Sequence, residues 1–163
     1  MWRPSLGAAE LNWNLVFGFI NTIALAGWLA LAVLPRGPKV MALVLYAGAA
    51  LLCLVYAILF LLLIAKAVDP GLVAGASGTG DFTSITGIRR LFMSDGGLVV
   101  GWTHYLAFDL FVGLWIAKDA DHKGFSRIVQ LPFLVATLLA GPIGLLAWLM
   151  VRERRARRAA REA

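Results

Sequence analysis

The stretch VMALVLYAGAALLCLVYAILFLLLIA, residues 40–65, contains no charged side chain and lies between Lys39 and Lys66. Crossing the roughly 30 Å hydrocarbon layer of a bilayer takes about 20 helical residues. An uninterrupted apolar run of this length therefore predicts a transmembrane helix. The composition agrees, because a chain with 61% hydrophobic residues, 15% charged residues and a mean hydropathy of +0.83 is too apolar for a water-soluble domain of this size.

Three further apolar runs are long enough to cross a membrane. The four predicted spans are residues 13–34, 40–65, 98–117 and 128–151. The first ends at Leu34-Pro35-Arg36-Gly37-Pro38, which breaks a helix. All four are predicted to be helices, because an open sheet leaves its edge groups unsatisfied in lipid. The sequence thus predicts one all-α transmembrane domain over residues 1–163, an integral bundle of four membrane helices.

The first span could also be interpreted as a cleaved signal peptide, because Arg3 precedes it and small residues follow. Its apolar length of about 22 residues exceeds the usual apolar region of about 7 to 15 residues, which favours a retained span. The single Cys53 lies inside the second span and excludes a disulfide framework.

The distribution of basic residues predicts the orientation. Four spans place the N-terminus, residues 66–97 and the C-terminus on one side, which then holds ten of the fifteen Lys and Arg residues. Positive residues are retained in the cytoplasm. The Ala/Arg-rich composition is typical of a bacterial chain. We therefore expect a multi-pass protein of the bacterial inner membrane with both termini cytoplasmic.

The chain has a net charge of +6, and six of its fifteen basic residues lie in the tail, residues 152–163, which directly follows the last apolar run. Such a tail favours contact with anionic lipid headgroups over a role with nucleic acid. The expected partners are membrane lipids, and no nucleic acid.

The one long connection, residues 67–97, has two parts. Residues 69–80 are rich in glycine, but a phosphate loop is poorly supported because no Lys-Ser/Thr pair follows and no strand precedes. From Asp81 onward apolar residues recur at helical spacing, namely Phe82, Ile85, Ile88, Leu91 and Phe92. This pattern predicts a short interfacial helix between the second and third spans.

His104 and Asp109 are the two residues inside the spans that suggest a functional site. Ionisable groups are costly in lipid and usually mark function, and a carboxyl group there should be neutral or paired. At about 100° per residue they point about 140° apart around the third helix, so both cannot face one neighbouring helix. They flank a groove or contact different helices.

Depth along the helices gathers polar groups into one layer. At about 1.5 Å per residue, Asn21 lies about 12 Å from the cytoplasmic end, His104 about 9 Å and Asp109 about 16 Å. Gly141-Pro142 lies at about 13 Å, and Pro142 would leave the carbonyl group of Leu138 without its helical donor. This layer is the predicted site.

Structural roles are the alternative for several of these positions. Asn14, Gly18 and Asn21 form one stripe on the first helix, and such residues commonly join helices in lipid, at about 0.6 to 2 kcal/mol each. Gly97 and Gly101 match a small-residue packing pattern. Packing is also expected for the stripe Tyr46, Ala49, Ala50, Cys53 and Tyr56, and a solvated turn for residues 118–123.

The run Gly101-Trp102-Thr103-His104-Tyr105-Leu106-Ala107-Phe108-Asp109-Leu110-Phe111-Val112-Gly113, followed by Leu131-Pro132 and Gly141-Pro142-Ile143-Gly144, resembles the abscisic-acid-deficiency-4-like membrane proteins. Plant members of that family are required to make the xanthophyll neoxanthin from violaxanthin. The Trp-x-His and Asp-Leu-Phe elements fall on Trp102, His104 and residues 109–111. The resemblance therefore includes both ionisable residues chosen on physical grounds.

The resemblance implies isomerase chemistry on a carotenoid or isoprenoid. Converting a 5,6-epoxide to an allenic alcohol needs protonation of the epoxide oxygen and removal of a vinylic proton, which is acid–base work that needs no cofactor. Asp109 would be the acid and His104 the base. The expected contacts to a hydrophobic polyene ligand come from Asn14, Asn21, Trp102, Tyr105, Phe108 and Pro142. No metal site is expected.

Other interpretations remain open on the sequence. The chain could be a non-catalytic membrane scaffold that binds carotenoid or lipid, in which Asp109 and His104 only fix the bundle. His104 could also be an axial haem ligand. The sequence leaves open a homo-oligomer and an assembly with carotenoid-pathway enzymes.

Overall fold

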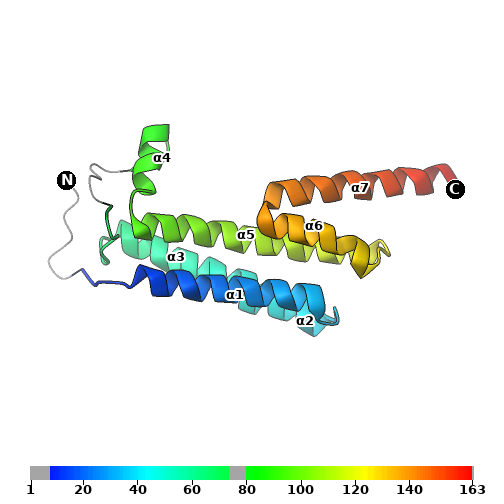
Figure 1. Ribbon diagram of the computed structural model, residues 1–163, viewed down its shortest axis with the longest axis horizontal. Coiled ribbons are helices and arrows are strands. Elements are labelled where there is room, and N and C mark those ends of the chain that lie inside the picture. Colours follow the sequence, from blue (N-terminus) through cyan, green and yellow to red (C-terminus); the bar gives the residue numbers. More distant parts are fainter. Residues whose placement is uncertain (1–7, 74–79, 163) are drawn as a thin grey trace. The chain divides into compact units, whose positions relative to one another are not determined.

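The computed structural model describes residues 8–73 and 80–162, with side chains up to residue 154. Arg3 and part of the glycine-rich connection, residues 74–79, lie outside the described residues. The elements in chain order are α1 (Trp13–Val33), α2 (Pro38–Leu43), the π-helix η1 (Val44–Ala50), α3 (Leu51–Ile64), α4 (Ile85–Leu91), α5 (Asp95–His122), α6 (Arg127–Leu139) and α7 (Gly141–Glu162) (Figure 1).

Three helices are long and apolar enough to cross a membrane within the part of the chain that the structure describes. They are Trp13–Val33, the continuous helix Pro38–Ile64 formed by α2, η1 and α3, and Asp95–His122. Large apolar side chains such as Leu29, Leu61 and Phe111 are at least half exposed. Such a surface suits lipid rather than water. The all-α membrane architecture predicted from the sequence is confirmed in this form.

The predicted fourth span, residues 128–151, is divided between α6 and α7, so a count of four spans is not confirmed. Ala140 leaves the helical conformation, and Pro142 is the second residue of the new helix, where its missing N–H group breaks no hydrogen bond. Pro142 therefore does not orphan the Leu138 carbonyl group as expected. At about 1.5 Å per residue, the 13-residue α6 is about 20 Å long, too short for the hydrocarbon layer.

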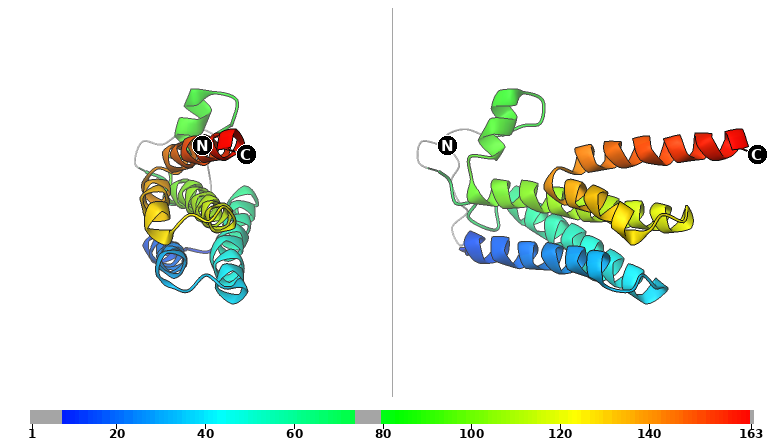
Figure 2. Two further views of the ribbon diagram at one scale, coloured as in Figure 1. Left: turned by 90° about the vertical axis from the view of Figure 1, so that its right-hand side faces the viewer. Right: turned by 45° about the vertical axis from the view of Figure 1, so that its right-hand side comes forward.

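α6 and α7 form an antiparallel hairpin (Figures 1 and 2). Gly144 allows the close turn, because a Cβ atom there would overlap the backbone and hydroxyl group of Thr137. Trp148 of α7 is fully buried, with its ring edge-on to Phe125 at 5.0 Å and to Phe133 at 5.5 Å between centroids. The hairpin is thus held by aromatic packing around one tryptophan.

The C-terminal tail begins beside the C-terminal end of α5. The Asp119 carboxylate accepts a hydrogen bond from Trp148 Nε1 at 3.1 Å and pairs with Arg152 Nε at 3.1 Å. The tail therefore starts at the same end of α5 as residues 118–127. Four full crossings would instead place the tail and residues 118–127 on opposite sides of the membrane. The predicted solvated turn at 118–123 is also mostly helix, because α5 continues to His122 and the chain turns at Gly124, which has a φ of 68°.

The helices divide into two compact units, to which α1 and α5 both contribute. The first contains Met1–Ile23 and Ala50–Leu106, and the second contains Ala24–Ala49 and Ala107–Ala163. In the first unit, Trp13 Nε1 donates to the Asp69 carbonyl at 3.0 Å, and Gly96 lies directly against the Trp13 ring. These contacts join the start of α1, the segment after α3 and the start of α5.

The short helix predicted after Asp81 is present as α4. Ser84 caps it by accepting a hydrogen bond from the Gly87 N–H group at 2.9 Å. Asp81 in turn accepts from the Thr83 hydroxyl group at 2.8 Å and from the Thr83 N–H group at 2.9 Å. These hydrogen bonds lower the pKa of Asp81, with the Thr83 hydroxyl group as the largest cause. A position of α4 at the membrane surface stays a prediction.

Candidate functional site

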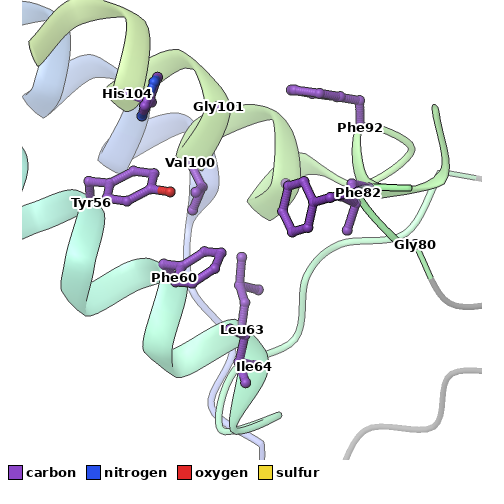
Figure 3. A pocket seen from close by; sticks show the side chains of 12 residues that line it. Tyr56, Phe60, Leu63, Ile64, Gly80, Phe82, Phe92, Val100, Gly101 and His104 are labelled. Atoms are coloured by element: carbon purple, nitrogen blue, oxygen red, sulfur yellow. The ribbon is translucent and has the colours of Figure 1, made fainter. Parts of the chain in front are cut away.

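A largely apolar pocket of about 500 Å³ lies in the first unit, between α3, α5 and the segments that flank α4 (Figure 3). Its lining includes Tyr56, Phe60, Leu63, Phe82, Phe92, Val100 and His104. Apolar walls with few polar groups are typical of sites for small hydrophobic ligands. The imidazole of His104 and the hydroxyl group of Tyr56 are the polar side-chain groups of this lining.

His104 and Tyr56 lie against each other at one end of this His104 pocket. Their ring centroids are 5.5 Å apart with an angle of 56° between the planes, and Tyr56 also stacks on Phe60 at 5.6 Å and 11°. Figure 3 shows Tyr56 beside His104, with its hydroxyl group pointing among the other lining residues. A histidine and a phenol can donate and accept protons, so this end of the pocket can support acid–base chemistry.

A second apolar pocket of about 400 Å³ shares Phe92 and Gly101 with the first. It is also lined by Phe17, Leu98, Trp102 and Tyr105. The Phe92 ring packs so tightly on Gly101 that a Cβ atom there would overlap it. Because Gly101 has no side chain, the Phe92 ring can pack against it and form a wall that the two pockets share.

Two of the predicted substrate contacts, Trp102 and Tyr105, lie in this second pocket and stack at 5.2 Å and 20°. Asn21 positions Trp102, because its side-chain oxygen accepts a hydrogen bond from Trp102 Nε1 at 3.1 Å. Asn21 also donates to the Phe17 carbonyl at 2.7 Å. Its part in the first unit is therefore to orient an aromatic wall.

Asn14 and Phe108 are exposed on their helices, and neither lines the pockets described above. The stripe that joins Asn14 to Asn21 was expected to allow close approach of another helix. At Gly18, however, a Cβ atom would meet nothing within 4 Å among the described residues. Among the described residues no helix therefore approaches closely at Gly18, and a packing role for this position stays a prediction.

Asp109 belongs to the second unit and is buried, with 8% of its surface exposed. Its Oδ1 atom lies so close to Gly141 that a Cβ atom there would overlap it. The structure thus brings together two of the predicted groups, the Asp109 carboxyl and the Gly141-Pro142 turn. Pro142 itself is exposed. Asn21 and His104 contact residues of the first unit instead.

Sequence reasoning missed Tyr56 and Phe92 as pocket residues. The spacing of a regular α-helix places Tyr56 on a packing stripe with Tyr46. The π-helix at Val44–Ala50 changes the rotation per residue and so turns the two side chains relative to each other. The stripe is not one face, because Ala49 is 3% exposed and Tyr46 is 69% exposed. The usable signal is the phenol itself, because Tyr56 and Tyr46 are the two phenols of the otherwise apolar span 40–65.

Together these features define a helical membrane protein with a largely apolar pocket lined by a histidine. Residues 15–148 match the family described as ABA DEFICIENT 4-like, and the chain belongs to this family. The resemblance inferred from residues 101–113 is therefore confirmed over most of the chain. No curated protein and no solved structure matches it.

Proposed function

We propose that the protein isomerises an elongated carotenoid or isoprenoid within the membrane, with His104 as the proton-accepting group. The observation that carries this proposal is the His104 pocket, in which an imidazole and a phenol face otherwise apolar walls. A hydrophobic polyene end group fits such a lining. The second pocket beyond Phe92 and Gly101 offers a continuation for a long chain.

The proposed reaction conserves composition. For an epoxide substrate, one proton goes to the oxygen, the adjacent C–O bond breaks, and His104 removes one vinylic proton to form the allene. No electron donor or acceptor is required. Tyr56 contacts His104 directly and is the candidate acid within this pocket. Asp109, the acid expected from the sequence, is a buried carboxyl group of the second unit.

A non-catalytic carotenoid- or lipid-binding scaffold is the second candidate function. The close contact of Asp109 with Gly141 favours it, because this contact gives the carboxyl group a structural role at the α6–α7 turn.

Expression in a carotenoid-producing host with analysis of pigments separates the two functions. Catalysis predicts new pigments of unchanged mass that disappear in His104→Gln. Cys53→Ser, a control on α3 outside the pocket lining, keeps them. Unaltered pigment that co-purifies with the protein would instead support binding.

We also propose that the C-terminal tail and residues 118–127 share the cytoplasmic side, with the N-terminus on the other side. Three crossings by the three long helices give this arrangement, and it agrees with the Asp119–Arg152 ion pair. The cytoplasmic side then holds eleven of the fifteen basic residues, compared with ten for the four-span arrangement. Relative to the sequence-based expectation, the C-terminal tail keeps its side, whereas the N-terminus and the segments 35–39, 66–97 and 118–127 change sides.

A further inference from the structure

A third, chemically different cavity lies in the second unit, at the C-terminal end of α5. It measures about 570 Å³, and its lining includes Arg36, Met41, Leu45, Tyr46, Lys118 and His122. One part of the wall is therefore cationic or titratable, and another part is apolar. This combination differs from the His104 pocket, whose lining carries no Lys or Arg side chain.

Arg36 is the buried cation of this cavity, with only 2% of its side chain exposed. Its Nε donates to the Leu31 carbonyl at 3.2 Å, and its Nη1 donates to Asp121 Oδ1 at 3.0 Å and also to the Gln130 side-chain oxygen. Nη2 is buried and has no hydrogen-bond partner among residues 8–73 and 80–162. A buried charged donor without an acceptor is costly, so an acceptor is expected.

The charges around Arg36 leave a positive excess. Burial lowers the pKa of Arg36, the Asp121 carboxylate partly restores it, and Arg127 lowers it again; the guanidinium still stays protonated. The Asp121 carboxylate also lines the cavity, but it is occupied by Arg36 and by Gln130 Nε2 at 2.9 Å. Lys118 adds a second positive charge to the wall.

We infer that this cavity binds a phosphate group, held by Arg36 and Lys118. Guanidinium and ammonium groups together are a common phosphate-binding set. The cavity lies at the break between two candidate spans, at Arg36 to Pro38. The ends of membrane spans are where basic residues meet lipid headgroups. Met41 and Leu45 provide an apolar wall next to the cationic one. The phosphate can therefore come from an anionic phospholipid headgroup or from free phosphate.

The test measures binding to the purified full-length protein in detergent. Native mass spectrometry follows titrations with dioleoyl phosphatidylglycerol and dioleoyl phosphatidylcholine, and inorganic phosphate is added as a competitor. Lys118→Gln removes one cation of the cavity. Arg36→Lys keeps a positive charge beside Asp121 but removes the Nη2 donor that has no partner. Lys123→Gln is the matched control, because Lys123 is exposed and does not line the cavity.

Lys118→Gln and Arg36→Lys are each expected to weaken phosphatidylglycerol binding about tenfold, as for the loss of one charge-assisted hydrogen bond. Lys123→Gln should stay within about twofold of the natural protein. Competition by inorganic phosphate would identify free phosphate as a sufficient ligand, and its absence would identify the lipid. Phosphatidylcholine carries its phosphate next to a choline cation, which a cationic wall repels, so equal binding of both lipids would overturn the inference. Equal effects of Lys118→Gln and Lys123→Gln would also overturn it. The lysine pair keeps the test valid if Arg36→Lys does not fold.

Discussion

The contact between Asp109 and Gly141 predicts that Gly141→Ala destabilises the protein. A Cβ atom at Gly141 would overlap the Asp109 carboxyl group, so the start of α7 or the aspartate must move. Overpacking of this kind typically costs about 1–3 kcal/mol. For a chain of this length, each kcal/mol lowers the Tm by about 2–4 °C. The assay is thermal unfolding of the purified protein in detergent.

Gly18→Ala is the control, because a Cβ atom there meets nothing within 4 Å among the described residues. It should not destabilise, since alanine is favoured over glycine inside a helix by about 0.8–1.0 kcal/mol. A double-mutant cycle with Asp109→Ala isolates the contact, because Gly141→Ala should cost at least 1 kcal/mol less once the carboxyl group is gone. Additive effects of the two substitutions, or a Gly141→Ala protein as stable as Gly18→Ala, would refute the assigned contact.

Three further predictions concern the site, the loop and the topology. Asp109→Asn should preserve expression and insertion but abolish pigment conversion if the carboxyl group is the acid; full conversion would return Asp109 to a packing role. The hydrogen bonds that lower the pKa of Asp81 stabilise the start of α4 above the unfolded pKa of about 3.9, and this contribution is lost as pH falls through the folded pKa. Hydrogen exchange, corrected for intrinsic rates, should therefore show α4 amides losing protection in acid, and Asp81→Asn should remove this pH dependence; an unchanged response in the variant would contradict it. In a Cys53→Ser background, cysteines placed at position 123 and in the tail should both resist a membrane-impermeant reagent added outside the cell. Labelling of only one of the two would show that they lie on opposite sides of the membrane, as an even number of crossings requires.

Hydrophobicity predicts the membrane helices well. An uncharged apolar run as long as residues 40–65 is stable only as a helix that is buried or exposed to lipid. The predicted fourth span is not confirmed, and the reason is local. Its apolar content is sufficient, but Gly141-Pro142 begins a new helix and Gly144 lets that helix fold back against Thr137. Hydropathy does not distinguish a proline inside a span from a proline that starts the next helix.

The candidate site was only partly accessible from the sequence. His104 can be selected from the sequence because an ionisable group inside a membrane span is costly and usually marks a functional site. The structure places His104 in a pocket. The direction in which its neighbour Tyr56 points depends on a π-helix that the sequence periodicity does not reveal. The position of Phe92 depends on how the segment after α4 packs against Gly101. The sequence predicts ligand contact for Asn21, which stays a prediction, but it does not predict the hydrogen bond that Asn21 accepts from Trp102.

The most direct test of the proposed function is turnover by the purified protein. The protein in lipid nanodiscs would be incubated with a 5,6-epoxy carotenoid, and products would be separated by chromatography and weighed by mass spectrometry. The account predicts an allenic product of unchanged mass, formed by the natural protein and by Cys53→Ser but lost in His104→Gln. A His104→Gln protein that converts the substrate at the natural rate would contradict it.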